Sequence, residues 1–435
     1  MRILRSHLIS GLHGRVKVPG DKSIAHRGIM LAAISRGKSR LDHFPFSLDC
    51  LTTIRAFSQL GVSSVVSSNK QVVTINGVGL DGLKQPSGPL NMGNSGTTTR
   101  LISGLLAGQT FSSSLIGDQS LSKRPMLRVS QPLNLMGGKI NSLDGHLPIK
   151  INGQKLHAID YQLPIASAQV KSALILAALY GSSTSTFVEK LPTRNHTEKM
   201  LAAFGAQINT AKDNLTITVS PRPHLHGQQF IIPGDFSSAA FFIVAATLVP
   251  NSTISLKDVG INSTRTGLLT VLKKMGGRFS LTGQTRTVEP RANLQVHSAN
   301  LSPIKIGKTQ IPGLIDELPL VALLMSRADG LSKITGAEEL RLKEVDRIKV
   351  IVSEFKKLGI AISELADGFL IDGRQPWQIK NRHLDSHGDH RIAMTLAVAA
   401  LLADCSQPIT LEQADSVQIS YPDFFQDLDQ LSMNK

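Results

Sequence analysis

The sequence predicts an α/β protein of two domains, each built from three copies of one repeat. Three observations carry this prediction. Six apolar helical segments recur at near-constant spacing, amphipathic segments recur between them, and two nearly identical pentads divide the chain. A chain of 435 residues has the length of two or three domains. Each repeat takes up about one sixth of it, which is room for two helices and several strands.

The first series consists of segments that begin with Ser or Asp and continue as nearly all-apolar helices. Their starts lie 70 to 79 residues apart. A helix that is apolar on most sides is buried in a core, and Ser or Asp is a preferred N-cap. We therefore expect six buried helices capped at their first residues, which are Ser23, Ser95, Ser167, Ser237, Asp316 and Asp389.

The second series has apolar residues at i, i+3, i+4 and i+7 and ends at a glycine, as amphipathic helices often do. Strand-like segments such as QVVTING, NLTITVS and GFLIDG fill the gaps. No strand can follow the last amphipathic segment, YPDFFQDLDQLS, so we expect the N-terminal RILRS and HGRVKV to supply one. The stop glycines are Gly61, Gly137, Gly205, Gly276 and Gly359.

The two pentads are PGDKS (Pro19–Ser23) and PGDFS (Pro233–Ser237). Pro-Gly pairs occur at turns, so we interpret both pentads as crossings between domains. Residues 20–232 then hold repeats one to three. Residues 1–19 and 233–435 form a discontinuous domain of repeats four to six.

Composition narrows the class of protein. The net charge of +15 indicates an anionic partner, which could be nucleic acid, a membrane or a small polyanion. An aromatic content of 4% argues against base-stacking platforms. The longest apolar runs have 12 residues and no secretory signal is visible, so we expect no membrane association and a cytoplasmic location. Cys50 and Cys405 are too few for a disulfide framework.

Basic residues gather at or beside the starts of the apolar helices. A helix start presents unpaired N–H groups and a positive dipole end, so several starts facing one cleft would bind anions. We expect a ligand with more than one phosphate or carboxylate, although each residue alone could be an ordinary solvated charge. The basic residues are Lys22, Arg27, Arg100, Arg124, Arg128, Lys171, Arg194, Lys343, Arg347 and Arg391.

Acidic residues are scarce near these starts. Asp316 and Glu344 stand among cations, which makes them candidate general acids or bases, with a structural ion pair or an N-cap as the alternative. In DSHGDH, His387, Asp389 and His390 have the spacing of metal ligands, but no further His or Cys lies nearby. We expect no metal.

Eight motifs follow one another between Pro19 and Tyr421: VPGDKSIAHR, MGNSGTTTRL, GDQSLSKRPM, SAQVKSALILA, PGDFSSAAFF, LIDELP, LKEVDRI and SHGDHRIAM. In this order they closely resemble the 3-phosphoshikimate 1-carboxyvinyltransferase (EPSP synthase) family. The resemblance implies two domains of three βαβαββ units each, an inside-out α/β barrel known as the enolpyruvyl transferase fold. It also implies an active site in the cleft between the domains, which closes on substrate.

The resemblance further implies a reaction of chorismate and aromatic amino acid biosynthesis. The enolpyruvyl group of phosphoenolpyruvate is transferred to the 5-hydroxyl of 3-phosphoshikimate, and phosphate is released by addition and elimination. The implied partners are these two small molecules, with no cofactor, no metal and no nucleic acid, and the implied state is a monomer.

The family motifs carry site residues over to this chain. The residues implied to bind 3-phosphoshikimate are Lys22, Ser23, Arg27, Ser167, Ala168, Gln169, Thr193, Asp316 and Lys343. The residues implied to bind phosphoenolpyruvate are Lys22, Gly96, Arg124, Gln169, Arg347 and Arg391. The implied catalytic residues are Lys22 and the two proton-transferring carboxylates, Asp316 and Glu344. The sequence leaves open which carboxylate is the base and which is the acid.

Some positions depart from the family pattern. KE[ST]DR is KEVDR here, so Val345 removes a hydroxyl. Glu339 stands where one branch often has Asn, and Ile419 where that branch has Lys. Gly96 favours inhibition by glyphosate, which occupies the phosphoenolpyruvate site in this family. Leu101 in place of Pro, together with Ile419, opposes inhibition, so we expect it to be of intermediate strength.

Two other functions are weighed against this one. The sister transferase that acts on UDP-N-acetylglucosamine shares the fold, but it typically uses a loop cysteine as its acid. The matching loop, Gly117–Met126, contains none. A basic nucleic-acid-binding protein would suit the net charge, but no recognisable binding motif is present.

Overall fold

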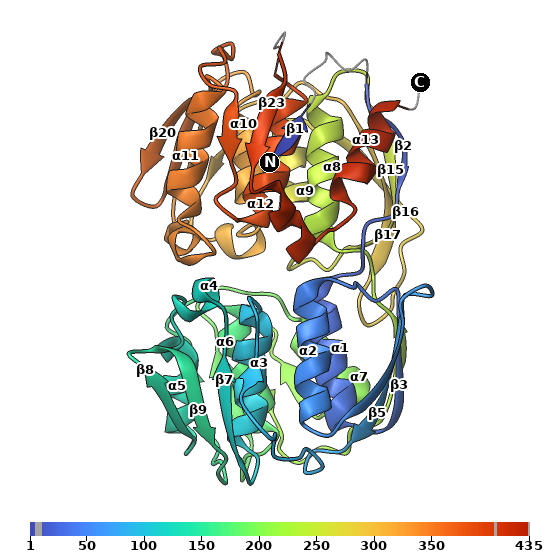
Figure 1. Ribbon diagram of the computed structural model, residues 1–435, viewed down its shortest axis with the longest axis vertical. Helices are drawn as coiled ribbons and strands as arrows, with labels where there is room; N and C mark the ends of the chain where they lie inside the picture. The colour runs from blue at the N-terminus through green and yellow to red at the C-terminus, as the bar shows by residue number, and fades with distance from the viewer. Residues whose placement is uncertain (5–10, 404–406, 434–435) are drawn as a thin grey trace. The chain divides into compact units, whose positions relative to one another are not determined.

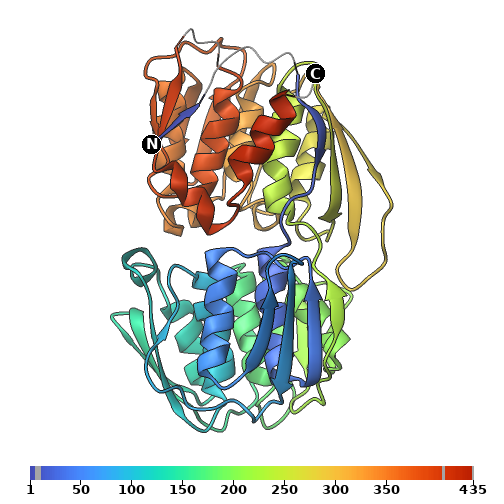
Figure 2. The same cartoon turned by 45° about the vertical axis from the view of Figure 1, so that its right-hand side comes forward.

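The computed structural model describes residues 1–4, 11–403 and 407–433. The chain divides into two compact units, which we call the contiguous unit (Gly20–Ile232) and the split unit (Met1–Pro19 with Pro233–Lys435). The chain passes from one unit to the other inside PGDKS and directly before PGDFS. Each unit combines helices with small sheets on its outside (Figures 1 and 2).

The contiguous unit has three long buried helices, α1, α3 and α6, and α3 packs against both of the others. Its helices are α1 (Lys22–Ile34), α2 (Leu48–Gln59), α3 (Gly96–Ala107), α4 (Gln119–Ser122), α5 (Leu127–Leu135), α6 (Ala168–Ala178) and α7 (His196–Phe204). Its strands are β3 (Arg36–Asp42), β4 (Ser63–Ser67), β5 (Val72–Val78), β6 (Leu90–Asn91), β7 (Ser112–Ile116), β8 (Lys139–Leu143), β9 (His146–Asn152), β10 (Asp160–Gln162), β11 (Ser185–Val188), β12 (Ile208–Thr210), β13 (Thr216–Val219) and β14 (Gln229–Ile231).

The split unit repeats this plan around α8, α10 and α12. Its helices are α8 (Phe236–Leu248), α9 (Gly267–Met275), η1 (Ile311–Gly313), α10 (Leu318–Met325), η2 (Glu338–Leu342), α11 (Arg347–Lys357), α12 (His390–Ala400), η3 (Ala414–Ile419) and α13 (Phe424–Met433). Its strands are β1 (Arg2–Leu4), β2 (His13–Val16), β15 (Thr253–Gly260), β16 (Arg278–Thr282), β17 (Arg291–His297), β18 (Lys305–Ile306), β19 (Leu331–Ile334), β20 (Ala361–Leu365), β21 (Gly368–Asp372), β22 (His383–Asp385) and β23 (Ile409–Glu412).

One sheet topology recurs throughout the described residues. In the order β6-β7-β9-β8, the first pair is parallel and the next two pairs are antiparallel. The orders β10-β11-β13-β12 and β18-β19-β21-β20 follow the same rule. With the two helices between these strands, each of these repeats is a βαβαββ unit. The sheet of repeat six shows three strands in the described residues, in the order β1-β23-β22. The predicted fold class is therefore confirmed.

Three sheets take a strand from a distant part of the chain. The sheet of repeat one begins with β14, in which Phe230 pairs with Leu41 of β3. The sheet of repeat four uses β2 next to β15, and that of repeat six uses β1, in which Ile3 pairs with Thr410. Residues 2–4 of RILRS therefore supply a strand to the sheet of repeat six, the repeat that ends with the last amphipathic helix, as predicted. HGRV instead serves repeat four, and Arg5 and Ser6 lie outside the described residues.

The N-caps agree with the sequence at three helices. Ser95 accepts a hydrogen bond from the backbone N–H of Thr98 at 3.3 Å, and Ser167 from that of Val170 at 3.4 Å. Asp389 accepts from the backbone N–H of Arg391 at 2.8 Å. These short polar side chains satisfy N–H groups that the helix leaves unpaired.

At the other three helices the predicted cap is wrong. α1 is capped by Asp21 rather than Ser23, and α8 by Asp235 rather than Ser237. In both pentads Asp has an extended backbone and directly precedes the helix, so its carboxylate reaches the N–H groups of the first turn and each Ser lies inside its helix. α10 begins after Glu317, whose side chain makes no capping bond, which leaves Asp316 available to other groups.

The stop glycines of the amphipathic helices are confirmed. All five have a positive φ, between 82° and 103°, which residues with a Cβ rarely adopt. A strand follows each of them, as the sequence predicts. The amphipathic helices concerned are α2, α5, α7, α9 and α11.

Candidate active site

In the contiguous unit, two arginines flank the start of α3. A Cβ added to Gly96 would lie 3.2 Å from Nη1 of Arg124 and 3.3 Å from Nη1 of Arg100. Arg100 Nη1 also donates to Oε1 of Gln169 at 2.5 Å, and Gln169 donates to Thr97 at 2.9 Å. The structure thus brings Gly96, Arg124 and Gln169 together at one helix start. Two guanidinium groups and a helix N-terminus suit a phosphate or a carboxylate.

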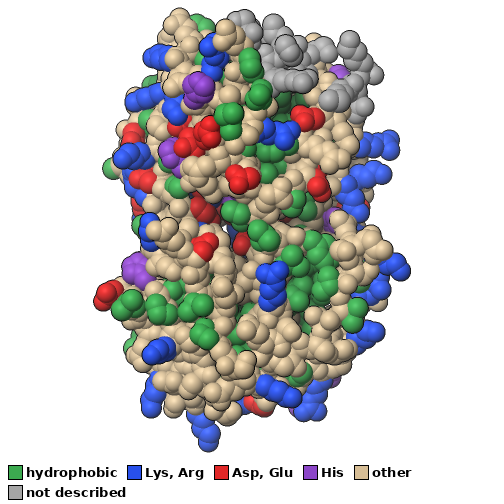
Figure 3. Space-filling view, viewed as in Figure 1, with side chains coloured by type: hydrophobic (Ala, Val, Ile, Leu, Met, Phe, Trp, Pro, Cys, Tyr) green, Lys and Arg blue, Asp and Glu red, His purple; other side chains and the backbone are tan. Residues whose placement is uncertain are grey.

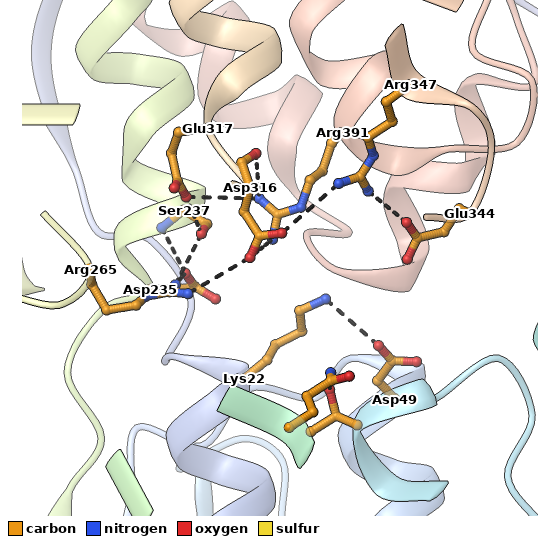
Figure 4. Close-up of polar contacts among 12 residues, drawn as sticks. Lys22, Asp49, Asp235, Ser237, Arg265, Asp316, Glu317, Glu344, Arg347 and Arg391 are labelled. Atoms are coloured by element: carbon orange, nitrogen blue, oxygen red, sulfur yellow. Dashed lines mark hydrogen bonds and ion pairs between the residues drawn. The ribbon is translucent and has the colours of Figure 1, made fainter. Parts of the chain in front are cut away.

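The start of α1 carries Lys22 and Ser23. Lys22 Nζ lies 3.7 Å from Oδ2 of Asp49 on α2, a residue that the sequence analysis did not name (Figure 4). Arg27, one turn further, is buried, and its Nε donates to Oγ1 of Thr197 at 2.7 Å. Its Nη2 donates to Ser172 at 2.8 Å. The guanidinium therefore has a fixed orientation, set by α6 and α7.

The start of α6 carries Ser167, Ala168 and Gln169. Thr193 lies five residues beyond the end of β11, and its hydroxyl donates to the carboxylate of buried Glu189. The single hydroxyl proton of Thr193 is directed at this carboxylate, so the hydroxyl can offer an incoming phosphate only its lone pairs. The adjacent Arg194 is partly buried.

A buried ion triad lies beneath this segment. Lys171 Nζ is 2.8 Å from Glu189 and 2.7 Å from Glu198, and the lysine side chain is 1% exposed. Because the charge of Lys171 is neutralised by these two buried carboxylates, the lysine stabilises the fold and is not part of an anion site. The interpretation of Lys171 as an anion-binding residue is therefore wrong, and its sequence pattern offered no way to see this.

A chain of hydroxyl groups joins the three helices of this region. His26 Nδ1 is 2.7 Å from Oγ1 of Thr53, which is 2.7 Å from Oγ1 of Thr98, which in turn is 2.7 Å from Oγ of Ser95. Burial, together with the positive charges of the neighbouring Lys22 and Arg27, lowers the pKa of His26 to about 3. The imidazole is therefore neutral at physiological pH and ties α1 to α2 and α3.

In the split unit, three guanidinium groups surround Asp316 (Figure 4). Its carboxylate lies 3.4 Å from Nη2 of Arg391 and 3.9 Å from Nη1 of both Arg265 and Arg347. Arg391 Nη1 also donates to the backbone oxygen of Asp316 at 3.3 Å. Opposite charges at these distances favour the ionised carboxylate.

Arg347 is held between two further carboxylates. Its Nε lies 2.8 Å from Oδ2 of buried Asp389, and its Nη2 lies 2.7 Å from Oε2 of Glu344. Burial opposes the charge of Arg347, but Asp389 and Glu344 outweigh it and raise the pKa of the guanidinium above its usual value. Asp389 thus caps α12 and orients Arg347, which accounts for its place in DSHGDH without a metal.

Lys343 precedes Glu344 in the loop after η2. Burial lowers the pKa of Lys343, and Arg347 lowers it further, while Asp316, Glu344 and Glu339 act in the opposite direction. A lysine with a lowered pKa is better able to exchange a proton near neutral pH. Glu339, which departs from the family pattern, therefore acts on the site through its charge.

The sequence analysis missed the groups behind Asp316. Arg265 is 4% exposed and donates from Nη2 to Asp235 and to Ser237, both at 3.0 Å. The Ser237 hydroxyl donates to the carboxylate of buried Glu317. Arg265 lies outside the predicted helix starts, so neither the spacing nor the motifs pointed to it.

The predicted site residues thus form two groups, one in each unit. In the contiguous unit they are Lys22, Ser23, Arg27, Gly96, Arg124, Ser167, Ala168, Gln169 and Thr193. In the split unit they are Asp316, Lys343, Glu344, Arg347 and Arg391.

Two features are absent from the described part of the chain. None of its helices has both the length and the apolarity that crossing a bilayer requires. In the same residues, no three His, Cys, Asp or Glu side chains are grouped so as to hold a metal ion. On the face shown in Figure 3, Lys and Arg side chains are scattered among other types over both units.

Repeated βαβαββ units in both halves of the described chain, with cationic groups at the starts of buried helices, define an enolpyruvyl transferase. The profile of the family described as EPSP synthase (3-phosphoshikimate 1-carboxyvinyltransferase) matches residues 7–428. The chain belongs to this family.

Named relatives and solved structures agree. The chain is 54% identical to the 3-phosphoshikimate 1-carboxyvinyltransferase of Lactiplantibacillus plantarum, covering 97% of each protein. It is 52% identical to that of Oenococcus oeni, covering 100% of this chain and 99% of the other.

The solved EPSP synthase of Acinetobacter baumannii superposes with a TM-score of 0.86 at 40% identity, covering 99% of this chain and 97% of that one. The enolpyruvyl transferase NikO of Streptomyces tendae has a TM-score of 0.79 at 18% identity, which shows a common fold. These findings confirm the family assignment and do not favour the sister transferase that acts on UDP-N-acetylglucosamine.

Proposed function

We propose that the protein uses cationic groups of both units to transfer the enolpyruvyl group of phosphoenolpyruvate to the 5-hydroxyl of 3-phosphoshikimate. The activity follows from its membership of the EPSP synthase family, and the assignment of residues is our proposal. The observation that supports it most is the triple guanidinium environment of Asp316, which combines anion-binding groups with a carboxylate able to take a proton.

Phosphoenolpyruvate is bound by Arg124, Gln169 and the backbone at Gly96 in the contiguous unit, and by Arg347 and Arg391 in the split unit. Its phosphate and carboxylate match the geometry of paired guanidinium nitrogens. Lys22 adds a further positive charge. Ile419 cannot supply the cationic contact that the family's other branch has at this position.

3-Phosphoshikimate is bound by Lys22, Ser23 and Arg27 at its ring and carboxylate. Its phosphate meets the start of α6 at Ser167, Ala168 and Gln169, where unpaired N–H groups point outward. Thr193 lies beside them, but its hydroxyl proton is held by Glu189, so it does not donate to the phosphate, and Arg194 provides the charge. In the split unit, Asp316 and Lys343 contact the hydroxyl side of the ring.

Asp316 takes the proton of the 5-hydroxyl as that oxygen forms a bond to C2 of phosphoenolpyruvate, because its cationic surroundings keep it ionised. Glu344, which pairs with Arg347 until that arginine binds phosphoenolpyruvate, carries a proton in the complex and gives it to C3. In the second step Glu344, now ionised, takes a proton back from C3 as the bond between C2 and the phosphate oxygen breaks. Phosphate leaves, and the enol ether of 5-enolpyruvylshikimate 3-phosphate is formed. Lys343, with its lowered pKa, assists proton transfer between these groups.

The positive charge is assigned to these anionic substrates rather than to nucleic acid, which agrees with the scattered basic side chains in Figure 3. We further propose a cytoplasmic monomer that needs no cofactor or metal.

Release of inorganic phosphate tests the activity. We expect it only when 3-phosphoshikimate and phosphoenolpyruvate are both present, in equimolar amount with the enol ether and in the presence of a metal chelator. Phosphate release from phosphoenolpyruvate alone would contradict the proposed transfer.

A further inference from the structure

Arg265 is a buried cation beside Asp316 to which the family motifs assign no role. One terminal nitrogen, Nη2, is held by Asp235 and Ser237, each at 3.0 Å. The other, Nη1, faces Oδ2 of Asp316 at 3.9 Å (Figure 4). The guanidinium is thus fixed through one nitrogen and presents the other to the carboxylate.

The turn that carries Arg265, between β15 and α9, is itself fixed. Asn262 accepts hydrogen bonds from the backbone N–H of Thr264 at 3.1 Å and from its hydroxyl at 2.9 Å. The backbone N–H of Arg265 donates to the carbonyl of Asn262 at 2.8 Å. The Asn262 amide donates to buried Glu289 at 3.2 Å, which anchors the turn in the interior. Arg265 is therefore oriented before any substrate binds.

The three arginines around Asp316 have different partners in the proposed complex with substrate. In the proposed function Arg347 and Arg391 turn their charge to the anionic groups of phosphoenolpyruvate. Arg265 is held in place by Asp235 and Ser237 and stays beside Asp316. The charged groups near Asp316 and Arg265 include Arg347, Arg391, Lys343 and Asp235, and Arg347 and Arg391 are in turn paired with Glu344 and Glu317.

We propose that Arg265 is a positioning residue that keeps Asp316 ionised and oriented while Arg347 and Arg391 bind phosphoenolpyruvate. This inference rests on the proposed function, because it takes Asp316 as the base. The base must be ionised to accept the 5-hydroxyl proton. Removing an adjacent cation makes the ionised form less favourable, so the carboxylate becomes protonated at a higher pH.

The test is the pH dependence of kcat, which reports the enzyme–substrate complex. In Arg265→Gln we expect the acidic limb of the profile to move to higher pH by about one unit, and in Arg265→Lys, which keeps the charge, by less. Asp235→Asn keeps the cap of α8, since Asn caps as well as Asp, but removes a competitor for Arg265. We expect its acidic limb to move the opposite way, to lower pH.

Arg374→Gln is the matched control. It removes the same charge from the same unit, at an exposed arginine paired with Asp372, and should leave the limb in place. An unchanged limb in Arg265→Gln, or an equal shift in Arg374→Gln, would overturn the inference. If Arg265→Gln does not fold, the pH profile of Asp235→Asn tests the inference instead. An acidic limb that does not move in Asp235→Asn would also overturn it. Absence of turnover in the unmodified protein would instead overturn the proposed function.

Discussion

Asp389 and Arg347 form a two-point contact in which Nε and Nη2 of the guanidinium lie 2.8 and 3.3 Å from the two carboxylate oxygens. Asp389 is fully buried and Arg347 is 1% exposed. The same carboxylate caps α12. One acidic residue therefore sets both the start of a buried helix and the direction of a proposed substrate-binding arginine.

Asp389→Asn separates these two roles, because Asn also caps helices well while losing the charge. We expect the free energy of unfolding to fall by about 3 kcal/mol, since a buried guanidinium loses a charged partner. We also expect the KM for phosphoenolpyruvate to rise more than that for 3-phosphoshikimate. Urea denaturation and steady-state kinetics measure the two effects. Asp372→Asn, which breaks the exposed pair with Arg374, should change neither.

The two carboxylates proposed to move protons can be tested by isosteric amides. Asp316→Asn and Glu344→Gln keep shape but cannot transfer a proton, so kcat should fall by roughly 10²–10⁴-fold. Substrate binding, followed by calorimetry, should be largely kept. Glu364→Gln, at an exposed ion pair with Arg341 in the same unit, serves as the control. Near-normal turnover in either variant would remove that residue from the mechanism.

Gly96 lies against two guanidinium groups, so an added methyl crowds the proposed phosphoenolpyruvate site. We expect glyphosate to compete with phosphoenolpyruvate and to inhibit with intermediate strength in the unmodified protein. In Gly96→Ala the inhibition constant should rise more than the KM, because the longer inhibitor has less room. Gly88→Ala is the control, since its Cβ would meet no atom within 4 Å. Equal inhibition of all three proteins would show that Gly96 does not line the inhibitor's site.

His26 makes stability depend on pH. Its pKa is about 3 in the folded protein and 6.5 as a free side chain, so between these values the unfolded chain binds the extra proton. The stabilisation is complete above pH 6.5 and is lost as the pH falls towards 3. At pH 5 the loss is about 2 kcal/mol.

The check is urea denaturation from pH 8 to pH 5. His26→Asn, which can keep the bond to Thr53 but does not titrate, should flatten this dependence. His224→Asn, at an exposed histidine, should leave it unchanged. A slope that stays the same in His26→Asn would mean that other groups produce it.

The sequence predicted the repeats well because each depends on local chemistry. A glycine such as Gly205 stops a helix by its own backbone conformation, and an apolar segment such as α8 has to be buried. The caps at Ser23 and Ser237 were mispredicted because Asp21 and Asp235 compete for the same N–H groups, and only backbone geometry decides between them.

Residues of the candidate site could be predicted from the sequence only where they belong to one of the family motifs. Arg265 and Asp49 lie far along the chain from their partners Asp316 and Lys22, so no spacing links them. The roles of Thr193 and Lys171 depend on Glu189, a buried carboxylate that nothing in its sequence neighbourhood sets apart.

The strands that each unit takes from a distant part of the chain set an order for its assembly during synthesis. The contiguous unit has all its strands once residue 231 has left the ribosome, when β14 can join β3. β2 must wait for β15, and Ile3 can pair with Thr410 only after residue 410 has been made. Residues 2–4 are thus made long before their partner strand, and the split unit should fold more slowly than the contiguous one because its contacts span a greater sequence separation.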